Sequence, residues 1–206
     1  MRVLALDTTT REGSLALVED DRVIVERAGD PARSHAERLP GDLLRLLGET
    51  GVSASAIDVF AVAAGPGSFT GLRIGIATIQ GLAFVTGRPI VAVSALEALA
   101  QATSRGLLPG SIVAAWMDAH RREVFSALYQ VAEAPLFAPD RLVEIDRAAV
   151  GEPGATLSRW TERFPPVALF AGDGAAAYAT LLTESARVLP SPLLAGGIGL
   201  MAIARS

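Results

Sequence analysis

The feature that most constrains the fold is an approximate repeat of a buried strand that ends in an aspartate. One apolar run ends at Asp7, and a second, which begins about halfway along the chain, ends at Asp118. A short loop and a segment of alternating apolar and polar residues follow each run. The glycine-rich breaks at Gly65 and Gly172 are separated by nearly as many residues as the two aspartates. This spacing predicts two duplicated lobes, although two matches are also compatible with coincidence.

The order of the predicted elements indicates the fold of each lobe. In the first half, an antiparallel meander precedes alternating helices and strands, and the predicted residues are 2–7, 13–18 and 22–27 for the meander, then 34–47, 59–64, 70–86, 89–94 and 95–105. A mixed sheet of this order, with helices on its faces, is ribonuclease-H-like. A strand at 111–118 and another at 123–131 restart the pattern. We therefore predict an α/β protein of the actin-like ATPase (ASKHA) architecture, whose two ribonuclease-H-like lobes have mixed βββαβα sheets and a nucleotide site between them.

The predicted boundary between the lobes lies in the linker after residue 105. Residues 1–105 form the N-terminal lobe, and residues 106–206 form a smaller and more irregular C-terminal lobe. The irregularity is expected from residues 132–166, which are rich in proline and acidic residues.

A glycine-rich turn between a buried strand and a long apolar helix lies at the centre of the first lobe. Gly65 and Gly67 permit backbone angles that other residues avoid, and Ser68 or Thr70 can cap the helix that follows. The free N–H groups at such a helix start attract anions. The plainer interpretation is a well-capped turn without a ligand, and the pattern alone does not decide between the two.

The same helix contains glycines at helical spacing on one side. Gly71 and Gly75 share a face, and each glycine in a helix interior costs about 1 kcal/mol relative to alanine. Close approach of another helix would offset that cost. That helix can come from this chain or from a partner.

Composition excludes several classes of function. The net charge is −4, which does not favour a nucleic-acid surface that acts alone. All 18 basic residues are arginine, so a P-loop lysine and Schiff-base chemistry are excluded, and the absence of cysteine excludes disulfides and thiolate catalysis. An acidic residue at position 7 does not fit a secretory signal, and the uncharged run 188–204 is short for a membrane span. We expect a cytoplasmic protein with no membrane contact.

Candidate chemistry is concentrated at the ends of the predicted strands. A cleft between two lobes could bind a metal-bound phosphate and a nucleoside through ten residues: Asp7, Thr8, Thr9, Gly65, Gly67, Ser68, Asp118, Gly172, Asp173 and Gly174. We favour the alternative that Asp7 and Asp118 only cap turns, because His120, Arg121 and Arg122 stand where the first loop has hydroxyls. Neither His35 nor His120 has a second histidine at metal-ligand spacing, so no metal site is predicted.

Three segments carry a resemblance to a known family. LALDTTT at the start, SHAERL at residue 34 and above all AAGPGSFTGLRIGIATIQGLAF, with MDAHRREVFSALY later, resemble the TsaB (YeaZ) family. This family is the bacterial partner of the TsaD subunit in making N6-threonylcarbamoyladenosine at position 37 of tRNAs. The resemblance is strong over residues 1–100 and diffuse in most of the second half.

The resemblance implies a scaffold rather than an enzyme. Members of the family bind and activate the TsaD-type catalytic subunit, form homodimers in its absence, and assemble with a TsaE-type ATPase, so tRNA is reached through the complex. The dimerisation helices would be residues 34–50 and 70–86, and the implied interface residues are His35, Leu39, Leu43, Leu46, Gly71, Arg73, Ile74, Gly75, Thr78 and Leu82. No catalytic residue and no firmly bound cofactor are implied, although ATP or ADP and Mg could bind in the assembled complex.

Two enzymatic alternatives remain at this point. A nucleotide-dependent kinase or ATPase of the actin-like fold would use Asp7 and Asp118 to hold magnesium. A metallopeptidase has been attached to this superfamily, but the sequence offers no ligands for one.

Overall fold

The first sheet has the strand order that the sequence predicts for a ribonuclease-H-like lobe. The computed structural model of the chain describes residues 1–182 and 186–206. The sheet has the order β3-β2-β1-β4-β5, and its strands are β1 (Arg2–Asp7), β2 (Ser14–Glu19), β3 (Arg22–Ala28), β4 (Val59–Ala63) and β5 (Ile90–Val93). β1, β2 and β3 pair antiparallel, whereas β4 is parallel to β1 and to β5. The predicted meander and the parallel units that follow it are therefore confirmed.

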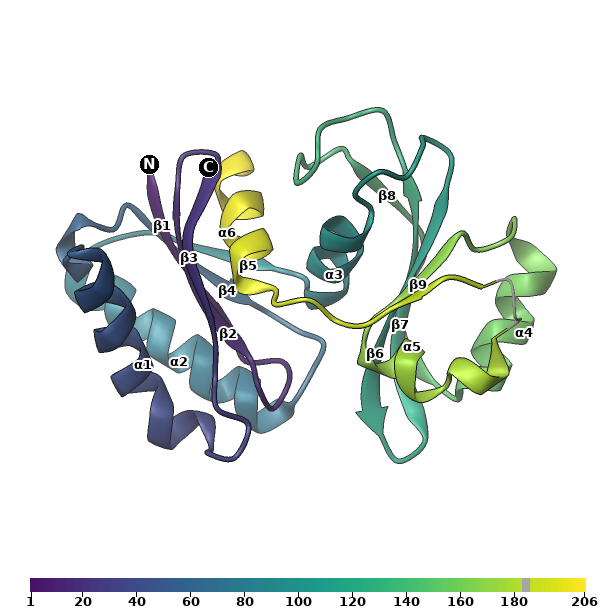
Figure 1. The fold of residues 1–206 in the computed structure, drawn as a ribbon, viewed down its shortest axis with the longest axis horizontal. Coiled ribbons are helices and arrows are strands. Elements are labelled where there is room, and N and C mark those ends of the chain that lie inside the picture. The colour runs from purple at the N-terminus through teal and green to yellow at the C-terminus, as the bar shows by residue number, and fades with distance from the viewer. Residues whose placement is uncertain (183–185) are drawn as a thin grey trace. The chain divides into compact units, whose positions relative to one another are not determined.

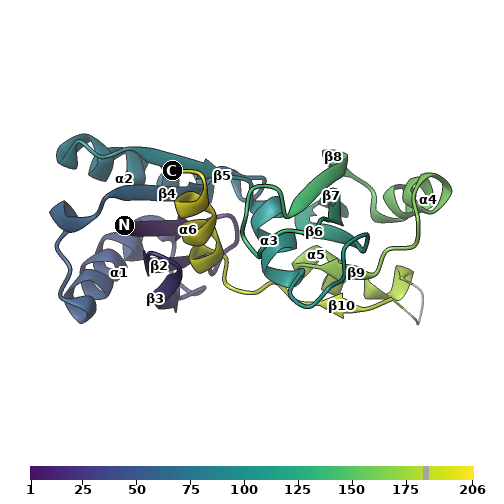
Figure 2. The same ribbon diagram turned by 90° about the horizontal axis from the view of Figure 1, so that it is seen from above.

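Both faces of this sheet are covered, as the nearly continuous apolar strands require. α1 (His35–Thr50) and α2 (Phe69–Thr86) lie on one face, and α6 (Ala195–Ala204) lies on the other (Figures 1 and 2). Because side chains alternate along a strand, Leu4 and Leu6 pack toward α1 and α2, while Ala5 contacts Gly199 of α6. The core on the α1 and α2 side is almost wholly aliphatic.

The second sheet repeats the order of the first. Its strands are β6 (Ile112–His120), β7 (Glu123–Val131), β8 (Leu142–Gly151), β9 (Leu169–Ala171) and β10 (Val188–Leu189), and they lie in the order β10-β9-β6-β7-β8. β6 thus takes the place of β1, and β9 takes the place of β4. The remaining helices are α3 (Ala95–Thr103), α4 (Pro153–Arg163) and α5 (Asp173–Ala177), with short 3-10 turns at Ala54–Ala56 and Ala179–Leu181. The predicted pair of ribonuclease-H-like sheets is confirmed.

The chain divides into two compact units that differ from the predicted lobes. The first comprises Met1–Ala98 and Leu193–Ser206, and the second comprises Leu99–Pro192. The sequence predicts a boundary after residue 105, with all later residues in one lobe. In the structure α6 packs on the first sheet, where Ser14 Oγ accepts hydrogen bonds from Leu194 N and Ala195 N at 3.3 and 3.0 Å.

The segment that was predicted to be irregular contains two regular elements. β8 is the edge strand of the second sheet, and its register with β7 shifts twice, which interrupts the alternation that a sequence pattern would show. α4 begins with Pro153, and the carboxylate of Glu152 caps it by accepting from Gly154 N and Ala155 N at 3.0 and 2.6 Å. Proline in the first turn of a helix is favourable, because its missing N–H has no partner to lose there.

Candidate functional site

The loop after β1 is closed on itself. Asp7, Thr8 and Thr9 are each no more than 3% exposed. Oδ1 of Asp7 accepts hydrogen bonds from the Thr9 backbone N at 2.8 Å and from Thr9 Oγ1 at 2.6 Å. This arrangement is the turn cap that the sequence analysis weighed against a role in nucleotide binding.

The glycine-rich turn after β4 packs against that loop. Ser68 N donates to the Thr9 carbonyl oxygen at 2.8 Å, and a Cβ added at Gly67 would lie 2.5 Å from Thr9 Cβ. Gly65 has a φ of 101°, a conformation that favours glycine. Ser68 caps α2 as predicted, because its Oγ accepts from Gly71 N at 3.2 Å. Close approach of the chain to itself therefore accounts for Gly67.

The glycine face of α2 points inward and does not form a docking surface. A Cβ at Gly71 would lie 2.1 Å from the carbonyl oxygen of Thr8, and a Cβ at Gly75 would lie 2.2 Å from Thr8 Oγ1. The prediction that these glycines admit a partner helix is therefore wrong, because the chain's own β1 loop occupies the space. Gly81 on the same helix has no atom within 4 Å of such a Cβ.

A buried polar network ties α1 to the same loop. Arg38 donates to Asp42 Oδ2 at 2.8 Å and to His35 Nδ1 at 2.9 Å, and it also bonds to the Glu12 carbonyl. Because a guanidinium only donates, His35 Nδ1 accepts, and His35 Nε2 carries the proton that it donates to the Thr10 carbonyl at 2.9 Å. Burial and, in smaller part, the Arg38 charge lower the pKa of His35, although its bond to Thr10 acts in the opposite direction.

Most of the predicted interface residues lie inside the first unit. Leu39, Leu43 and Leu46 are buried in the core beneath α1, and His35 is 7% exposed. The chain itself therefore covers most of these four side chains, which leaves them little surface for a partner. Of the α2 positions, Ile74, Thr78 and Leu82 are partly buried, whereas Arg73 is exposed and its guanidinium lies 5.4 Å from the ring centre of Phe69.

The exposed apolar side chains of the two helices are ones that the sequence analysis did not choose. Leu44 on α1 is 73% exposed, and Phe69, Phe84 and Val85 on α2 are 73%, 89% and 83% exposed. We call these four residues the outer helix face. For α1 the helical period could have revealed it, because Leu44 falls outside the stripe formed by Leu39, Leu43 and Leu46.

The second group of predicted site residues lies in the second unit, at the start of α5. Asp173 Oδ1 accepts from Asp118 N at 3.0 Å and from Gly174 N at 2.9 Å. A Cβ at Gly172 would lie 2.0 Å from the Trp116 carbonyl oxygen. Asp118 Oδ1 accepts from His120 N at 2.9 Å, and its Oδ2 lies 3.3 Å from His120 Nδ1. The predicted set thus forms one cluster of six residues in the first unit and one of four in the second.

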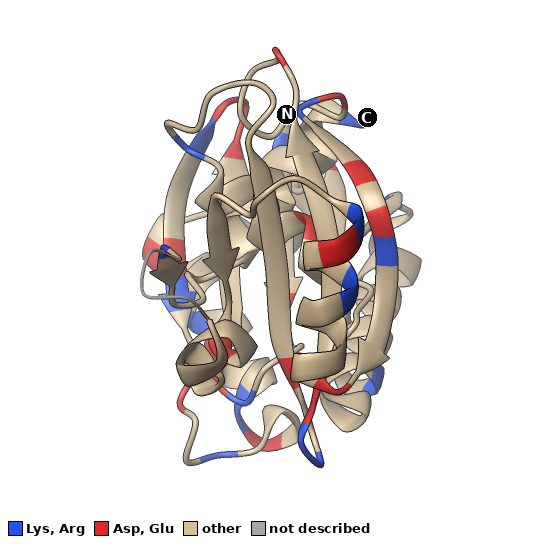
Figure 3. Ribbon diagram, turned by 90° about the vertical axis from the view of Figure 1, so that its right-hand side faces the viewer, with Lys and Arg blue, Asp and Glu red and all other residues tan. Residues whose placement is uncertain are grey.

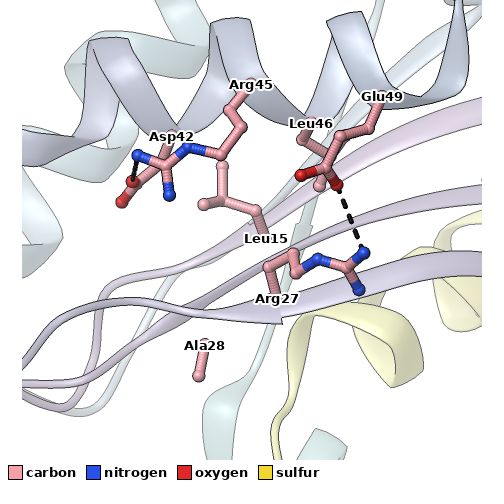
Figure 4. Close-up of a pocket in the computed structure, with 7 residues that line it drawn as sticks. All are labelled: Leu15, Arg27, Ala28, Asp42, Arg45, Leu46 and Glu49. Atoms are coloured by element: carbon pink, nitrogen blue, oxygen red, sulfur yellow. Dashed lines mark ion pairs between the residues drawn. The ribbon is translucent and has the colours of Figure 1, made fainter.

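A small cavity lies between β3 and α1. It has a volume of about 100 Å³, below the size of ordinary ligand pockets, and Arg27, Asp42, Arg45 and Glu49 line it (Figure 4). Arg27 pairs with Glu49 at 3.2 Å, and Arg45 pairs with Asp42 at 3.5 Å. A second cavity of about 300 Å³ in the other unit is lined mainly by apolar side chains, among them Trp160, Phe164 and Phe170.

The described residues offer little for a metal ion or a membrane. Residues 1–182 and 186–206 hold no group of three or more His, Cys, Asp or Glu side chains that could bind a metal ion. Among the helices of the same residues, α2 alone has the length and apolar composition of a membrane span. It contacts β1, β4 and β5 of its own unit.

Curated relatives match a little under two thirds of the chain. The "tRNA threonylcarbamoyladenosine biosynthesis protein TsaB" of Escherichia coli (strain K12) is 40% identical over 130 residues, which are 63% of this chain and 55% of that protein. The protein of the same name from Bacillus subtilis (strain 168) is 35% identical over 130 residues, 63% of this chain and 56% of the relative. The chain spans about half the length of the curated relatives it matches.

Solved structures match along nearly the whole chain. YeaZ from Pseudomonas aeruginosa is 33% identical, with a TM-score of 0.77 over 99% of this chain and 90% of that one. An activator of a 2-hydroxyisocaproyl-CoA dehydratase from Clostridium difficile has a TM-score of 0.52 at 8% identity, covering 100% of this chain and 95% of its own, and shares the fold alone. The family model described as "TsaD: tRNA N6-adenosine threonylcarbamoyltransferase" matches residues 29–193. The chain therefore belongs to that TsaD-like family, and within it to the TsaB (YeaZ) branch.

Proposed function

We propose that this chain is a non-catalytic subunit that binds and activates a TsaD-type catalytic subunit, which forms N6-threonylcarbamoyladenosine at position 37 of tRNA. The names of the two TsaB relatives support this class of process. The observation that carries the docking role is the outer helix face. A TsaE-type ATPase joins the pair in this proposal, and tRNA is bound by the assembly. Any ATP, ADP or Mg acts in the assembly as well.

The outer helix face has the chemistry of a protein interface. Aromatic residues are enriched at the centre of protein interfaces. Two of its four side chains are phenylalanines, and two of them, Phe84 and Val85, are adjacent at the end of α2. Gly41 and Gly48 of α1 and Gly81 of α2 have nothing within 4 Å of an added Cβ, so a partner helix can approach closely.

In this proposal the outer helix face also serves for self-association. α1 and α2 lie side by side on the sheet (Figure 1), so a second copy can present the same pair of helices in a symmetric contact. Homodimer and complex would then compete for one surface. In this proposal the catalytic subunit displaces the second copy.

Packing of the β1 loop disfavours the alternative of an independent kinase or ATPase. The Gly65–Ser68 turn is in contact with Thr9, and one carboxylate oxygen of Asp7 already accepts two hydrogen bonds. Titration calorimetry of the chain with MgATP separates the two functions. Micromolar binding that is lost in Asp7→Ala would favour the enzyme.

The docking role is tested by co-elution with the TsaD-type subunit of the same organism in size-exclusion chromatography. Charges placed on the outer helix face, in F84E/V85E, should abolish co-elution, because two carboxylates would be buried without partners. The matched control is V143E, which changes a 52% exposed valine on β8 in the second unit and should still co-elute. Undiminished co-elution of folded F84E/V85E would refute this interface.

A further inference from the structure

The turn between β6 and β7 has an unusual backbone. His120, Arg121 and Arg122 have φ values of 61°, 51° and 67°, so three successive residues with side chains occupy the left-handed region. His120 pairs with Glu123, which leaves Arg121 and Arg122 as the two central residues of a tight hairpin. Such turns favour Asn-Gly or Asp-Gly, because both central residues need a positive φ. Two arginines are therefore a poor choice for the stability of this turn.

Contacts within the chain do not offset that cost. Neither guanidinium has a hydrogen bond, an ion pair or a ring contact with any residue of 1–182 or 186–206. By contrast, Arg159 pairs with Asp146 at 2.8 Å, and Arg141 donates to the Ala132 and Ala134 carbonyls. β9 pairs with β6 only as far as Ala115, and β8 pairs with β7 only from Val124 onward. The turn therefore stands beyond the ends of both neighbouring strands.

Of the carboxylates near the turn, Asp118 and Asp173 have other partners, and Glu123 forms no ion pair with either arginine. Asp118 accepts from the backbone and lies beside the ring of His120, and Asp173 is held by Asp118 N and Gly174 N. In Figure 3, which views the second unit, blue and red segments alternate and do not gather into one broad basic face. The two arginines are therefore exposed and unpaired within the described residues, on a chain whose net charge is −4.

We propose that this arginine tip, formed by His120, Arg121 and Arg122, contacts phosphate groups of the RNA substrate. The inference rests on the proposed function, which supplies an RNA. Guanidinium groups bind phosphate oxygens in bidentate fashion, and phosphate contacts fix the position of a protein on a nucleic acid without reading its sequence. Because the tip is small and the chain is acidic, it contacts about two phosphates and positions an RNA that the catalytic subunit also holds.

The test measures binding of a tRNA transcript to the complex of this chain with its TsaD-type subunit, at several salt concentrations. The variant R121N/R122G replaces the tip with the sequence that the turn prefers. Its Tm should rise, while affinity for the transcript falls about tenfold and the slope of log K against log salt becomes less steep by about 1.5. A turn with a purely structural role would show the rise in Tm alone.

The matched control is R105Q/R147Q, which removes the same charge from two exposed arginines of the second unit. It should leave both the affinity and the slope near those of the wild type. An equal loss in the control, an unchanged affinity in R121N/R122G, or a loss of co-elution with the catalytic subunit in R121N/R122G would each overturn the RNA contact. If the wild-type chain binds no catalytic subunit, the proposed function fails, and the same titration on this chain alone decides the RNA contact.

Discussion

The loops after β1 and β6 occupy the same place in two sheets of the same strand order, yet one is buried and the other is exposed. Asp7, Thr8 and Thr9 lie under α2, whereas the residues after Asp118 run into an exposed tip with three left-handed residues. In both units a glycine at the start of the helix after the second parallel strand (β4 or β9) packs on the first strand or its loop. An added Cβ would lie 2.1 Å from the Thr8 oxygen at Gly71 and 2.0 Å from the Trp116 oxygen at Gly172.

The length of the helix after the second parallel strand, α2 in the first unit and α5 in the second, accounts for the difference in burial between the two loops. α2 has 18 residues and carries a second glycine, Gly75, so it covers the β1 loop over a full further turn. α5 has 5 residues and ends before it can cover the β6 loop in the same way. A repeated topology therefore leaves one strand end as part of a core and the other as a surface. Equivalent aspartates do not imply equivalent functions.

The largest expected change in stability comes from adding a side chain at Gly71, where α2 packs on the loop after β1. Gly71→Ala should destabilise the first unit by about 3 kcal/mol, because the added Cβ meets a backbone oxygen that cannot move without the loop. Urea unfolding followed by circular dichroism measures it. Both tryptophans, Trp116 and Trp160, lie in the second unit, so fluorescence follows that unit separately.

Gly81→Ala is the matched control on the same helix. Its Cβ meets nothing, and alanine should raise the stability by about 0.5 to 1 kcal/mol, because glycine loses more backbone entropy on folding. Equal effects of the two substitutions would contradict the packing of α2 on Thr8.

The sequence predicted features that depend on neighbouring residues, such as helix caps, better than contacts between distant parts of the chain. The cap at Ser68 depends on residues within one turn of the helix, because its Oγ accepts from Gly71 N at 3.2 Å. The packing of α6 on the first sheet depends on Gly199 meeting Val18, a contact between distant parts of the chain. No local pattern encodes it.

The error over the interface has a separate physical cause. Helical spacing shows which residues share a face, but it does not show which face is turned inward. α2 is apolar nearly all round, so Gly71 and Gly75 could equally have faced a partner. The contact of Thr8 with Gly71 and Gly75 shows that this face of α2 is turned toward the chain's own β1 loop. On α1 the leucines at 39, 43 and 46 formed a clear stripe, and this stripe proved to be the core.

The second unit differs from the first in its aromatic core, and its two tryptophans should respond unequally to substitution. Trp160 Nε1 donates to Asp146 Oδ2 at 2.6 Å, whereas Trp116 Nε1 is buried without a partner. Trp160→Phe should cost about 2 kcal/mol more than Trp116→Phe, since only the first loses a bond to a charged group. Urea unfolding, with the remaining tryptophan as the probe, compares them. Equal costs would show that the Asp146 bond adds nothing to stability.

The two histidines extend the comparison to pH. Burial, and in smaller part the charge of Arg38 that donates to its Nδ1, holds the folded pKa of His35 below the ordinary 6.5. Protons then bind the unfolded chain more readily, and stability falls as pH drops below about 6.5, by at most 1.4 kcal/mol per pH unit. Asp7 across the loop opposes this in part. Unfolding of H35N between pH 5 and 8 should lose the slope, whereas H120N at the exposed tip should keep it.

The smallest expected effect concerns α6, which follows β10 of the second sheet in the chain but covers the first sheet. Glu26 Oε1 accepts from Gly196 N at 2.7 Å, and burial raises the pKa of Glu26 above its ordinary 4.5, with Asp7 adding to the shift and the Gly196 bond opposing it. The folded chain therefore holds this proton more tightly. The contribution of protonated Glu26 to stability declines as pH rises from about 4.5 through the folded pKa, opposite in sign to that of His35.

Glu26→Gln keeps the acceptor and removes the charge, and should be more stable than the wild type at pH 7 by less than about 1 kcal/mol, since partial exposure screens the charge. Glu26→Ala, which also removes the acceptor, should lose about 1 kcal/mol as capped helix starts do. A glutamine variant that is less stable than the wild type at pH 7 would mean that the carboxylate charge itself holds α6 on the first sheet.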